Sequence, residues 1–210
     1  MTAPVEQYTD REDTRKRFSV IYNLIPDNAN TILDIGCARY DVETRDKNDL
    51  HRFLVNETEA VVSGIDLEED AINSMREEGY NVTVADAQNF DLEQLFDVII
   101  AGEVIEYLPN PGQFIDNSLD HLTDSGKIII TTENPVAFVY WRKALQGKEQ
   151  PNTLWFDPKH LANLSKYIEN KDIDITWISP DGGISTILWK LGFKRASAPR
   201  YAAIINKSPH

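Results

Sequence analysis

The sequence contains a single cysteine, Cys37, no long apolar run and fewer basic than acidic residues. One cysteine excludes a disulfide within the chain. No stretch approaches the roughly 18 consecutive apolar residues that a membrane-spanning helix needs, so we expect no transmembrane segment. The first residues lack the basic stretch and apolar core of a secretory signal, and we therefore expect a cytoplasmic protein.

Acidic residues outnumber basic ones: 34 Asp and Glu against 21 Lys and Arg give a net charge of −13. Such a surface repels phosphate backbones and disfavours a nucleic acid as partner. The densest basic segment, residues 11–17, also contains Glu12 and Asp13. We interpret it as the solvated face of a helix rather than as a binding patch.

The length of 210 residues suits one α/β domain with a sizeable core. No internal repeat or domain-scale linker is present, so we expect a single domain over residues 1–210 with a helical lead-in over residues 1–30. The capping-box pattern Thr9-Asp10-Arg11-Glu12 predicts a helix from about residue 10 to 25, which Pro26 ends.

The stretch Thr31 to Cys37 is a short apolar run that contains one acid, Asp34, and reaches glycine at Gly36. It predicts a strand buried on both faces, the pattern of parallel sheets. Helical patterns over residues 50–54, 68–78 and 114–122 alternate with further short apolar segments. Those further predicted strands are 61–66, 82–84, 96–101, 126–132, 172–178 and 201–206. The alternation indicates a mostly parallel sheet covered by helices on both faces.

Acidic side chains lie at four successive strand ends, namely Asp34, Asp66, Asp86 and Glu103. The carboxyl ends of parallel strands meet at one edge of a sheet, where nucleotides bind in doubly wound folds. Asp66 is placed to accept hydrogen bonds from a ribose diol, and Asp86 to bind the exocyclic amine of an adenine. One such acid more often caps a helix, but four in succession favour a nucleotide-type site.

Five segments in order resemble the motifs of the class I S-adenosylmethionine-dependent methyltransferases. The segments are 32–37, 64–67, 85–87, 96–108 and 122–132. The resemblance covers roughly residues 10–165. It implies a Rossmann-like α/β fold with a seven-stranded, mostly parallel sheet, helices on both faces and an antiparallel last strand. It also implies S-adenosyl-L-methionine as the cofactor.

The same resemblance implies which residues bind that cofactor. Gly36 would back its methionine part, Asp66 would bind the ribose hydroxyls, and Asp86 with Ala87 would bind the adenine. Glu103 would lie between cofactor and acceptor. The expected cofactor-binding residues are Asp34, Ile35, Gly36, Cys37, Asp66, Leu67, Asp86, Ala87, Ala101 and Glu103.

Two features depart from the family pattern. Ala38-Arg39-Tyr40 stands where further glycines are usual, and the interval from Gly36 to Asp66 is about ten residues longer than the family's. These departures keep a non-catalytic cofactor-binding protein open as an alternative. A dinucleotide oxidoreductase is disfavoured, because no G-x-G-x-x-G follows the first strand.

The segment Glu103 to Leu108 resembles the Glu-x-x-Glu-His element of quinone-biosynthesis O-methyltransferases. The resemblance implies O-methylation of a small molecule, with Glu103 and Glu106 as the catalytic residues that orient or deprotonate it. The element also resembles that of metal-dependent RNA 3′-end methyltransferases, which we keep as an alternative. Tyr107 replaces the histidine. His160 could substitute for it, but a lone histidine in a helix is more often a surface or capping residue, so we expect no obligatory metal.

Residues 134–160 interrupt the alternation of strands and helices and are expected to lie on the acceptor side. Their aromatic residues suit either an acceptor wall or plain core: Phe138, Tyr140, Trp141, Trp155 and Phe156. Within this segment, Asp157-Pro158 predicts the start of another helix that extends to residue 168.

Overall fold

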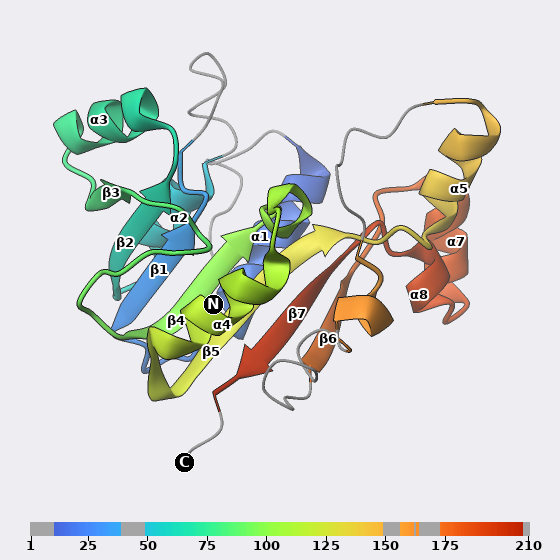
Figure 1. Cartoon of the computed structure of the whole chain (residues 1–210). Coiled ribbons are helices and arrows are strands. Elements are labelled where there is room, and N and C mark those ends of the chain that lie inside the picture. Colours follow the sequence, from blue (N-terminus) through green and yellow to red (C-terminus); the bar gives the residue numbers. More distant parts are fainter. Residues whose placement is uncertain (1–10, 39–48, 149–155, 162, 164–172, 208–210) are drawn as a thin grey trace.

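The computed structural model describes residues 11–38, 49–148, 156–161, 163 and 173–207, and the structural statements below concern these residues. Seven strands form one sheet in the order β3-β2-β1-β4-β5-β7-β6 (Figure 1). The strands are β1 (Thr31–Ile35), β2 (Val61–Asp66), β3 (Val82–Val84), β4 (Phe96–Gly102), β5 (Leu122–Glu133), β6 (Ile173–Ile178) and β7 (Arg200–Asn206). Each strand that the sequence predicts is therefore present.

The strand directions match the expected fold. Parallel pairing joins β1 to β2 and β4, β2 to β3, and β4 to β5. The last strand, β7, is antiparallel to both β5 and the edge strand β6. Ile35 is in register with Ile65 and with Ala101, so the carboxyl ends of β1, β2 and β4 lie side by side. The Rossmann-like prediction with an antiparallel last strand is confirmed.

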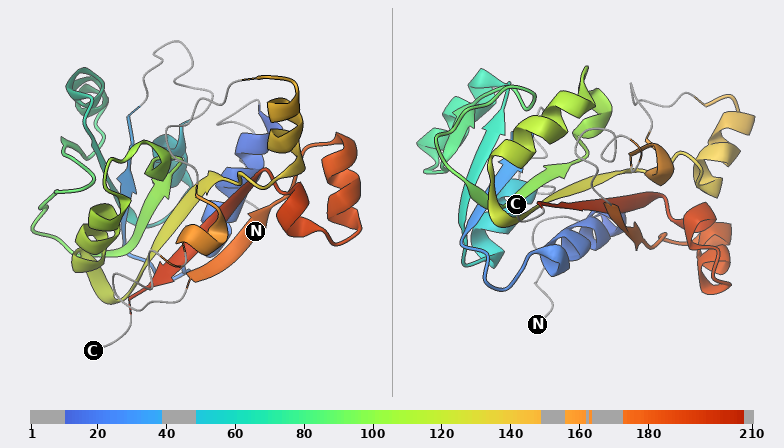
Figure 2. Two further views of the ribbon diagram at one scale, coloured as in Figure 1. Left: turned by 45° about the vertical axis from the view of Figure 1, so that its right-hand side comes forward. Right: turned by 60° about the horizontal axis from the view of Figure 1, so that its bottom comes forward.

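Helices cover both faces of this sheet. The right-hand view of Figure 2 shows α1 and α4 on opposite sides of it. None of the helices within the described ranges has the combination of length and apolar character that crossing a bilayer requires. The helices are α1 (Glu12–Leu24), α2 (Leu50–Glu57), α3 (Glu69–Glu77), α4 (Pro111–Asp120), α5 (Phe138–Leu145), α7 (Gly183–Lys190) and α8 (Lys194–Ser197), with a 3-10 turn, η3 (Ile105–Tyr107).

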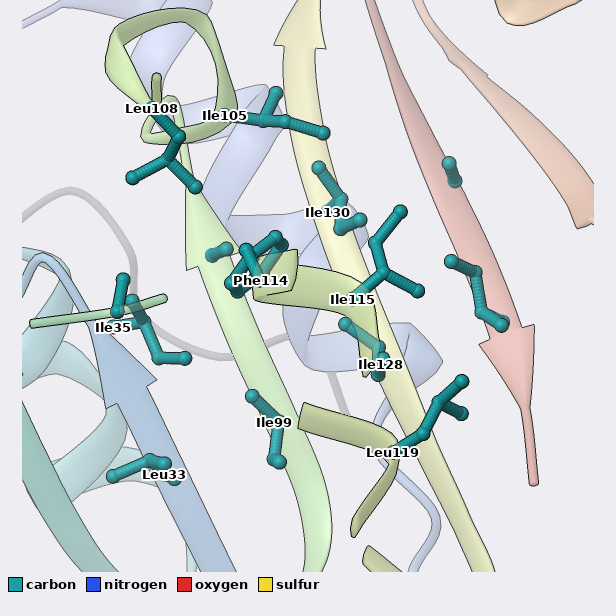
Figure 3. Packing of buried hydrophobic residues seen from close by; sticks show 14 of the residues in the cluster. Leu33, Ile35, Ile99, Ile105, Leu108, Phe114, Ile115, Leu119, Ile128 and Ile130 are labelled. Carbon is teal, nitrogen blue, oxygen red and sulfur yellow. The ribbon is translucent and has the colours of Figure 1, made fainter. Parts of the chain in front are cut away.

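Alternate residues of β1 enter different parts of the core. Leu33 belongs to the cluster that contains Phe114 of α4 (Figure 3). Ile32 belongs to the cluster beneath α1 and α2, where the rings of Phe18 and Phe53 stack 5.2 Å apart. Full burial of each such side chain contributes roughly 1.5–3 kcal/mol to folding. Burial on both faces explains why the strand has an almost continuous apolar sequence.

The first helix begins differently from the prediction. Its N-cap is Arg11, whose side chain makes no capping hydrogen bond, and Glu12 is the first helical residue. A capping box requires Glu12 at the third helical position, so that prediction is wrong; Thr9 lies outside the described residues. The acidic first turn instead complements the positive end of the helix dipole. The helix ends at Leu24, ahead of Pro26, as predicted.

The boundary between α4 and β5 also differs. We expected Leu122 to continue the helix, but α4 ends at Asp120 and Leu122 is the first residue of β5. The pairing of β5 with β4 shifts register between Phe96 and Val98. A bulge of this kind accommodates extra residues in one strand and lets it begin before Gly126.

The cap at Asp157 forms as the sequence predicts. Its Oδ1 accepts hydrogen bonds from the backbone nitrogens of Lys159, at 2.8 Å, and His160, at 3.3 Å. A helical turn follows from residue 158. Most of the predicted continuation to residue 168 lies outside the described residues.

Candidate active site

A cavity of about 900 Å³ lies at the carboxyl ends of β1, β2 and β4. Pockets that bind small molecules have volumes of roughly 300–1,000 Å³. The expected cofactor-binding residues that line it are Asp34, Ile35, Gly36, Cys37, Asp66, Leu67, Asp86, Ala87 and Glu103. Ala101 and Glu106 are buried and do not line it.

The turn after β1 forms the floor of this cavity. Gly36 has φ of +74°, a left-handed conformation that glycine adopts without steric cost. The backbone nitrogens of Gly36 and Cys37 both donate to the carbonyl oxygen of Ile65, at 2.9 and 3.1 Å. A Cβ added at Gly36 would overlap the side chain of Val104. The sequence therefore needs glycine here for both its backbone conformation and its small volume.

The carboxylate of Asp66 is fixed at the cavity wall by the backbone on both sides. Its Oδ2 accepts from the nitrogen of Ala38 at 3.0 Å, and its Oδ1 accepts from the nitrogen of Glu68 at 3.1 Å. A carboxylate has about four acceptor positions. These two bonds therefore orient Asp66 and leave capacity for a ligand's hydroxyl groups.

The carboxylate of Asp86 is oriented by a local turn. Its Oδ1 accepts from the backbone nitrogen of Gln88 at 2.9 Å and from that residue's side-chain amide at 3.3 Å. The Gln88 Oε1 in turn accepts from the nitrogen of Asn110 at 2.6 Å. This chain of bonds joins the loop after β3 to the residue that caps α4.

Asp34 is paired with a histidine that the sequence analysis did not identify. The Oδ2 of Asp34 lies 3.2 Å from Nδ1 of His51, and both side chains are almost completely buried. Burial raises the pKa of Asp34, and the hydrogen bond from His51 only partly opposes this. Nε2 of His51 has no partner among the described residues, although His51 lines the cavity. The pair therefore leaves one buried ring nitrogen beside the cavity without a hydrogen-bond partner among the described residues.

Cys37 lines the cavity as a protonated thiol. Burial, together with the nearby carboxylates of Asp34 and Asp66, raises the pKa of Cys37. A thiol needs a lowered pKa to act as a nucleophile at neutral pH. The environment thus opposes a nucleophilic role for Cys37.

Glu103 lies at the lip of the cavity and is held by two arginines. Its carboxylate is 2.8 Å from Nη1 of Arg17 in α1 and forms an ion pair with Nε of Arg200 in β7. Burial raises the pKa of Glu103, but the two arginines outweigh burial and bring the pKa below its usual value. Glu103 is consequently ionised at neutral pH and is a weak base.

The backbone at Glu103 is also unusual. Its φ of +61° is left-handed, which costs a residue other than glycine on the order of 1–3 kcal/mol. The Glu103 nitrogen donates to the Thr131 carbonyl at 2.9 Å, and the two ion pairs hold the side chain. This conformation directs Glu103 toward the arginines.

Glu106 points away from the cavity into the core. Its side chain is 1% exposed, and Oε1 accepts from the hydroxyl of Thr132 and from the nitrogen of Glu133 at 3.3 Å. Burial raises the pKa of Glu106 to about 7, although the bond from Thr132 lowers it in part. Its Oε2 has no partner among the described residues. In this conformation a molecule in the cavity does not reach Glu106.

The two glutamates do not form a shared cation site. Glu103 precedes the 3-10 turn that contains Glu106, and their carboxylates have different partners. His160 pairs with Asp157 at 2.8 Å and is largely exposed. Throughout the described ranges, no group of three His, Cys, Asp or Glu residues is arranged to hold a metal ion.

The aromatic residues expected at the acceptor wall lie mainly in a different groove. Phe138, Tyr140 and Trp141 line a groove of about 840 Å³ between α5 and the α7–α8 pair, which shares no lining residue with the first cavity. Phe156 packs against the main core cluster. Trp155 lies outside the described residues. An acceptor-side role for residues 134–160 remains a prediction.

Long-range packing explains which cavity residues the sequence analysis missed. Arg17 comes from α1 and His51 from α2, and nothing in their local sequence marks them as cavity residues. Arg200 reaches Glu103 from a strand 97 residues later. Only the tertiary arrangement reveals these contacts. Gln88, in contrast, follows Asp86 by two residues, so its place at the cavity could have been predicted from the motif that contains Asp86.

Comparison with known proteins gives a consistent family assignment. A family model described as a methyltransferase domain matches residues 26–179. The chain is 29% identical over 144 residues to the ubiquinone biosynthesis O-methyltransferase of Rickettsia conorii, which covers 68% of this chain and 47% of that protein. The enzyme of the same name from Rickettsia canadensis is 30% identical over 144 residues, which cover 68% of this chain and 58% of that protein. The chain therefore spans about half the length of these curated relatives.

Solved structures share the fold at low sequence identity. A SAM-dependent methyltransferase from Archaeoglobus fulgidus has a TM-score of 0.68 at 19% identity, covering 96% of this chain and 97% of its own. A possible histamine N-methyltransferase from Thermotoga maritima has a TM-score of 0.67 at 14% identity, and the match covers 97% of this chain and 92% of its own. An N-methyltransferase from Bradyrhizobium japonicum in complex with S-adenosyl-L-homocysteine has a TM-score of 0.61 at 15% identity, and the match covers 94% of this chain and 89% of its own.

Proposed function

The chain belongs to the methyltransferase domain family, and we propose that it transfers a methyl group from S-adenosyl-L-methionine to a small molecule, at oxygen. The family membership that the sequence motifs predict is confirmed by the match over residues 26–179. The observation that best supports the proposed activity is the cavity where Gly36, Asp66, Asp86 and Glu103 come together.

The described residues fit this cofactor. Gly36 lines the cavity with backbone alone, an arrangement that lets a ligand approach the chain closely. Asp66 retains acceptor capacity for two ribose hydroxyls, and Asp86 with Ala87 lies beyond it on the wall where an adenine would lie. The unsatisfied Nε2 of His51 is available to a polar group of the methionine part.

When bound, the cofactor supplies a methyl group that its sulfonium already activates. The protein's task is then to hold donor and acceptor in line and to exclude water. A general base is needed only when the acceptor is a hydroxyl that must lose its proton, and its efficiency depends on a pKa near the working pH.

The two glutamates suit different parts of that task. Glu103 is ionised and lines the cavity, so we assign it the orientation of the acceptor through a hydrogen bond rather than proton abstraction. Glu106 has a pKa near 7 but is closed off from the cavity. We assign it a positioning role, in which it holds η3 against β5 through Thr132 and Glu133.

Oxygen is the favoured acceptor atom because the curated relatives are named O-methyltransferases. The test is methyl transfer from S-adenosyl-L-methionine to a panel of phenolic, catecholic and aliphatic hydroxyl compounds, with formation of S-adenosyl-L-homocysteine as the readout. Turnover with a hydroxyl compound supports the proposal. Turnover only with amines would contradict O-methylation.

Two controls separate the alternatives. Methylation of short single-stranded RNA that depends on a divalent ion would favour the RNA-modifying alternative. Cofactor binding by a folded sample without turnover on any acceptor class would favour a non-catalytic protein. The matched variant Glu103→Gln keeps the side chain's size and should lower turnover at least about tenfold if the carboxylate orients the acceptor.

A further inference from the structure

The described residues 134–148 and 182–198, which we call the corner, contain an unusual number of exposed apolar side chains. They include α5, α7 and α8, which lie together beyond β6 and β7 in both Figure 1 and Figure 2. No residue of α7 is buried. Six large apolar side chains of the corner are more than half exposed: Trp141, Leu145, Ile184, Ile187, Leu191 and Phe193.

These side chains form ordered rows. Ile184, Ile187 and Leu191 follow the i, i+3, i+7 spacing of a single helix face. Trp141 and Leu145 are spaced i, i+4 and therefore lie on one face of α5. The groove of about 840 Å³ lies between α5 and the α7–α8 pair, so the apolar surface continues from one helix to the next. Elsewhere, exposed apolar residues such as Val61 and Leu95 are scattered.

The net charge of the corner is opposite in sign to that of the rest of the chain. Its two segments contain six basic residues and no Asp or Glu, whereas the rest of the chain has 15 basic and 34 acidic residues. The six are Arg142, Lys143, Lys148, Lys190, Lys194 and Arg195. Arg195 lies 3.8 Å from Asp157, a distant ion pair in which the arginine is 58% exposed.

Acids that border the corner are engaged elsewhere. Asp181 forms an ion pair with Lys16 of α1 at 2.7 Å. Glu133 is mostly buried and lies 3.9 Å from Nη2 of Arg200. Glu149 follows the first segment in the sequence and lies outside the described residues. The corner is therefore basic and apolar at once on an otherwise strongly acidic protein.

We propose that the corner docks on an anionic lipid bilayer. Trp, Leu and Ile interleaved with Lys and Arg on short helices is the composition of segments that lie in the membrane interface. Basic side chains near such a surface are attracted to anionic headgroups within a Debye length, roughly 10 Å. Because the remaining surface is acidic and is repelled, the corner is the face through which the protein can approach.

Two other occupants fit the observations less well. A two-fold dimer through the corner would place its six basic residues against the same residues of the second copy, and like charges oppose this contact. Single-stranded nucleic acid binds through basic grooves with stacking aromatic rings. Four of the six exposed apolar residues of the corner are instead aliphatic.

The test is flotation of the full chain with vesicles of phosphatidylcholine containing phosphatidylglycerol, and separately with phosphatidylcholine alone. We expect the protein to float with the anionic vesicles, with affinity falling at least about tenfold when salt is raised or when the anionic lipid is omitted. Ile187→Glu with Leu191→Glu should also reduce it at least about tenfold, because it places charges on the inserted face. Leu95→Glu, an exposed apolar residue outside the corner, is the matched control and should bind like the wild type.

Circular dichroism and binding of S-adenosyl-L-homocysteine would show that each variant is folded. Failure of the folded wild type to bind anionic vesicles would overturn the proposal, as would equal loss in Leu95→Glu. Self-association that Ile187→Glu abolishes, without vesicle binding, would assign the corner to a second copy, and binding of single-stranded RNA in its place would assign it to nucleic acid. Because cofactor binding is measured separately, loss of vesicle binding leaves the methyltransferase proposal intact.

Discussion

The cavity lies at the ends of β1, β2 and β4, the corner lies beyond β6 and β7, and the two regions are built in opposite ways. Around the cavity, Asp66 and Asp86 accept hydrogen bonds from backbone nitrogens, and Gly36 fills a position that no other residue fits. In the corner, α7 buries none of its residues and exposes Ile187 among its apolar side chains. The first arrangement suits a small polar ligand in a fixed position. The second suits an extended partner that needs no exact geometry.

The largest effect that separates the two regions is expected from Gly36→Ala. The added Cβ would overlap Val104 and would hold alanine at a left-handed φ. We expect cofactor affinity to fall by more than about tenfold and the free energy of unfolding to fall by roughly 1–3 kcal/mol. Calorimetry and chemical denaturation measure the two quantities, and vesicle binding should not change.

The matched control is Gly79→Ala. Gly79 also has a left-handed φ, of +93°, but no atom lies within 4 Å of a Cβ added there. It should reproduce the conformational cost without the loss of cofactor affinity. If both variants lost affinity equally, the close approach at Gly36 would not be the cause.

The next effect concerns the ribose assignment of Asp66. Asp66→Ala removes a charged acceptor that the backbone holds in place, and such hydrogen bonds contribute about 1.5–3 kcal/mol. Cofactor affinity should therefore fall roughly ten- to a hundredfold. Asp70→Ala, an exposed acid in the first turn of α3, is the control and should bind normally. Unchanged affinity in Asp66→Ala would remove Asp66 from the site.

A third effect is the pH dependence that Glu106 introduces. Because burial raises the pKa of Glu106 to about 7 from a usual value near 4.5, its contribution is complete below the usual value and is lost as pH rises through 7. Between pH 5 and 8 the free energy of unfolding of the wild type should fall relative to Glu106→Gln, by up to about 3 kcal/mol. Urea denaturation at both pH values measures the difference. A constant difference would show that Glu106 is not a buried acid.

Glu103→Gln should change the pH dependence of stability in the opposite direction to Glu106→Gln. The arginines hold the pKa of Glu103 below its usual value, so its contribution is present above that value and is lost as pH falls through the folded-state pKa. The variant should therefore lose stability relative to the wild type near neutral pH and approach it in acid.

The smallest expected effect is that of His51→Phe, which keeps a buried ring but removes its nitrogens. It leaves Asp34 without its partner and removes the buried Nε2 beside the cavity. We expect a several-fold loss of cofactor affinity, in accord with the net value of about 1 kcal/mol for one hydrogen bond. Phe53→Leu, a buried ring of the same helix outside the cavity, is the control. Equal affinity in the two variants would limit His51 to a structural role.

The sequence predicts the cavity better than its surroundings because the cavity depends on short segments at strand ends. Strands such as Thr31–Ile35 have a burial pattern visible in their composition, and their parallel order brings Gly36, Asp66 and Asp86 to one edge. Contacts such as Arg17 with Glu103 depend on the packing of α1, which local sequence does not encode.

The Glu103–Glu106 segment shows a second reason why part of the site escaped prediction. The resemblance implies that the carboxylates of Glu103 and Glu106 both act on the acceptor. The left-handed φ of Glu103 and the 3-10 geometry of the next three residues instead direct one carboxylate to arginines and the other to Thr132. Backbone conformations of this kind are held by tertiary contacts, so the spacing of the acids alone does not reveal them.

Calorimetric titration of the full chain with S-adenosyl-L-homocysteine, the demethylated cofactor, tests the central claim most directly. Methyltransfer requires that the cavity at the ends of β1, β2 and β4 hold this molecule. The account predicts one binding site per chain with a dissociation constant on the order of micromolar, a free energy of about −8 kcal/mol. No heat of binding from a folded sample would contradict the account.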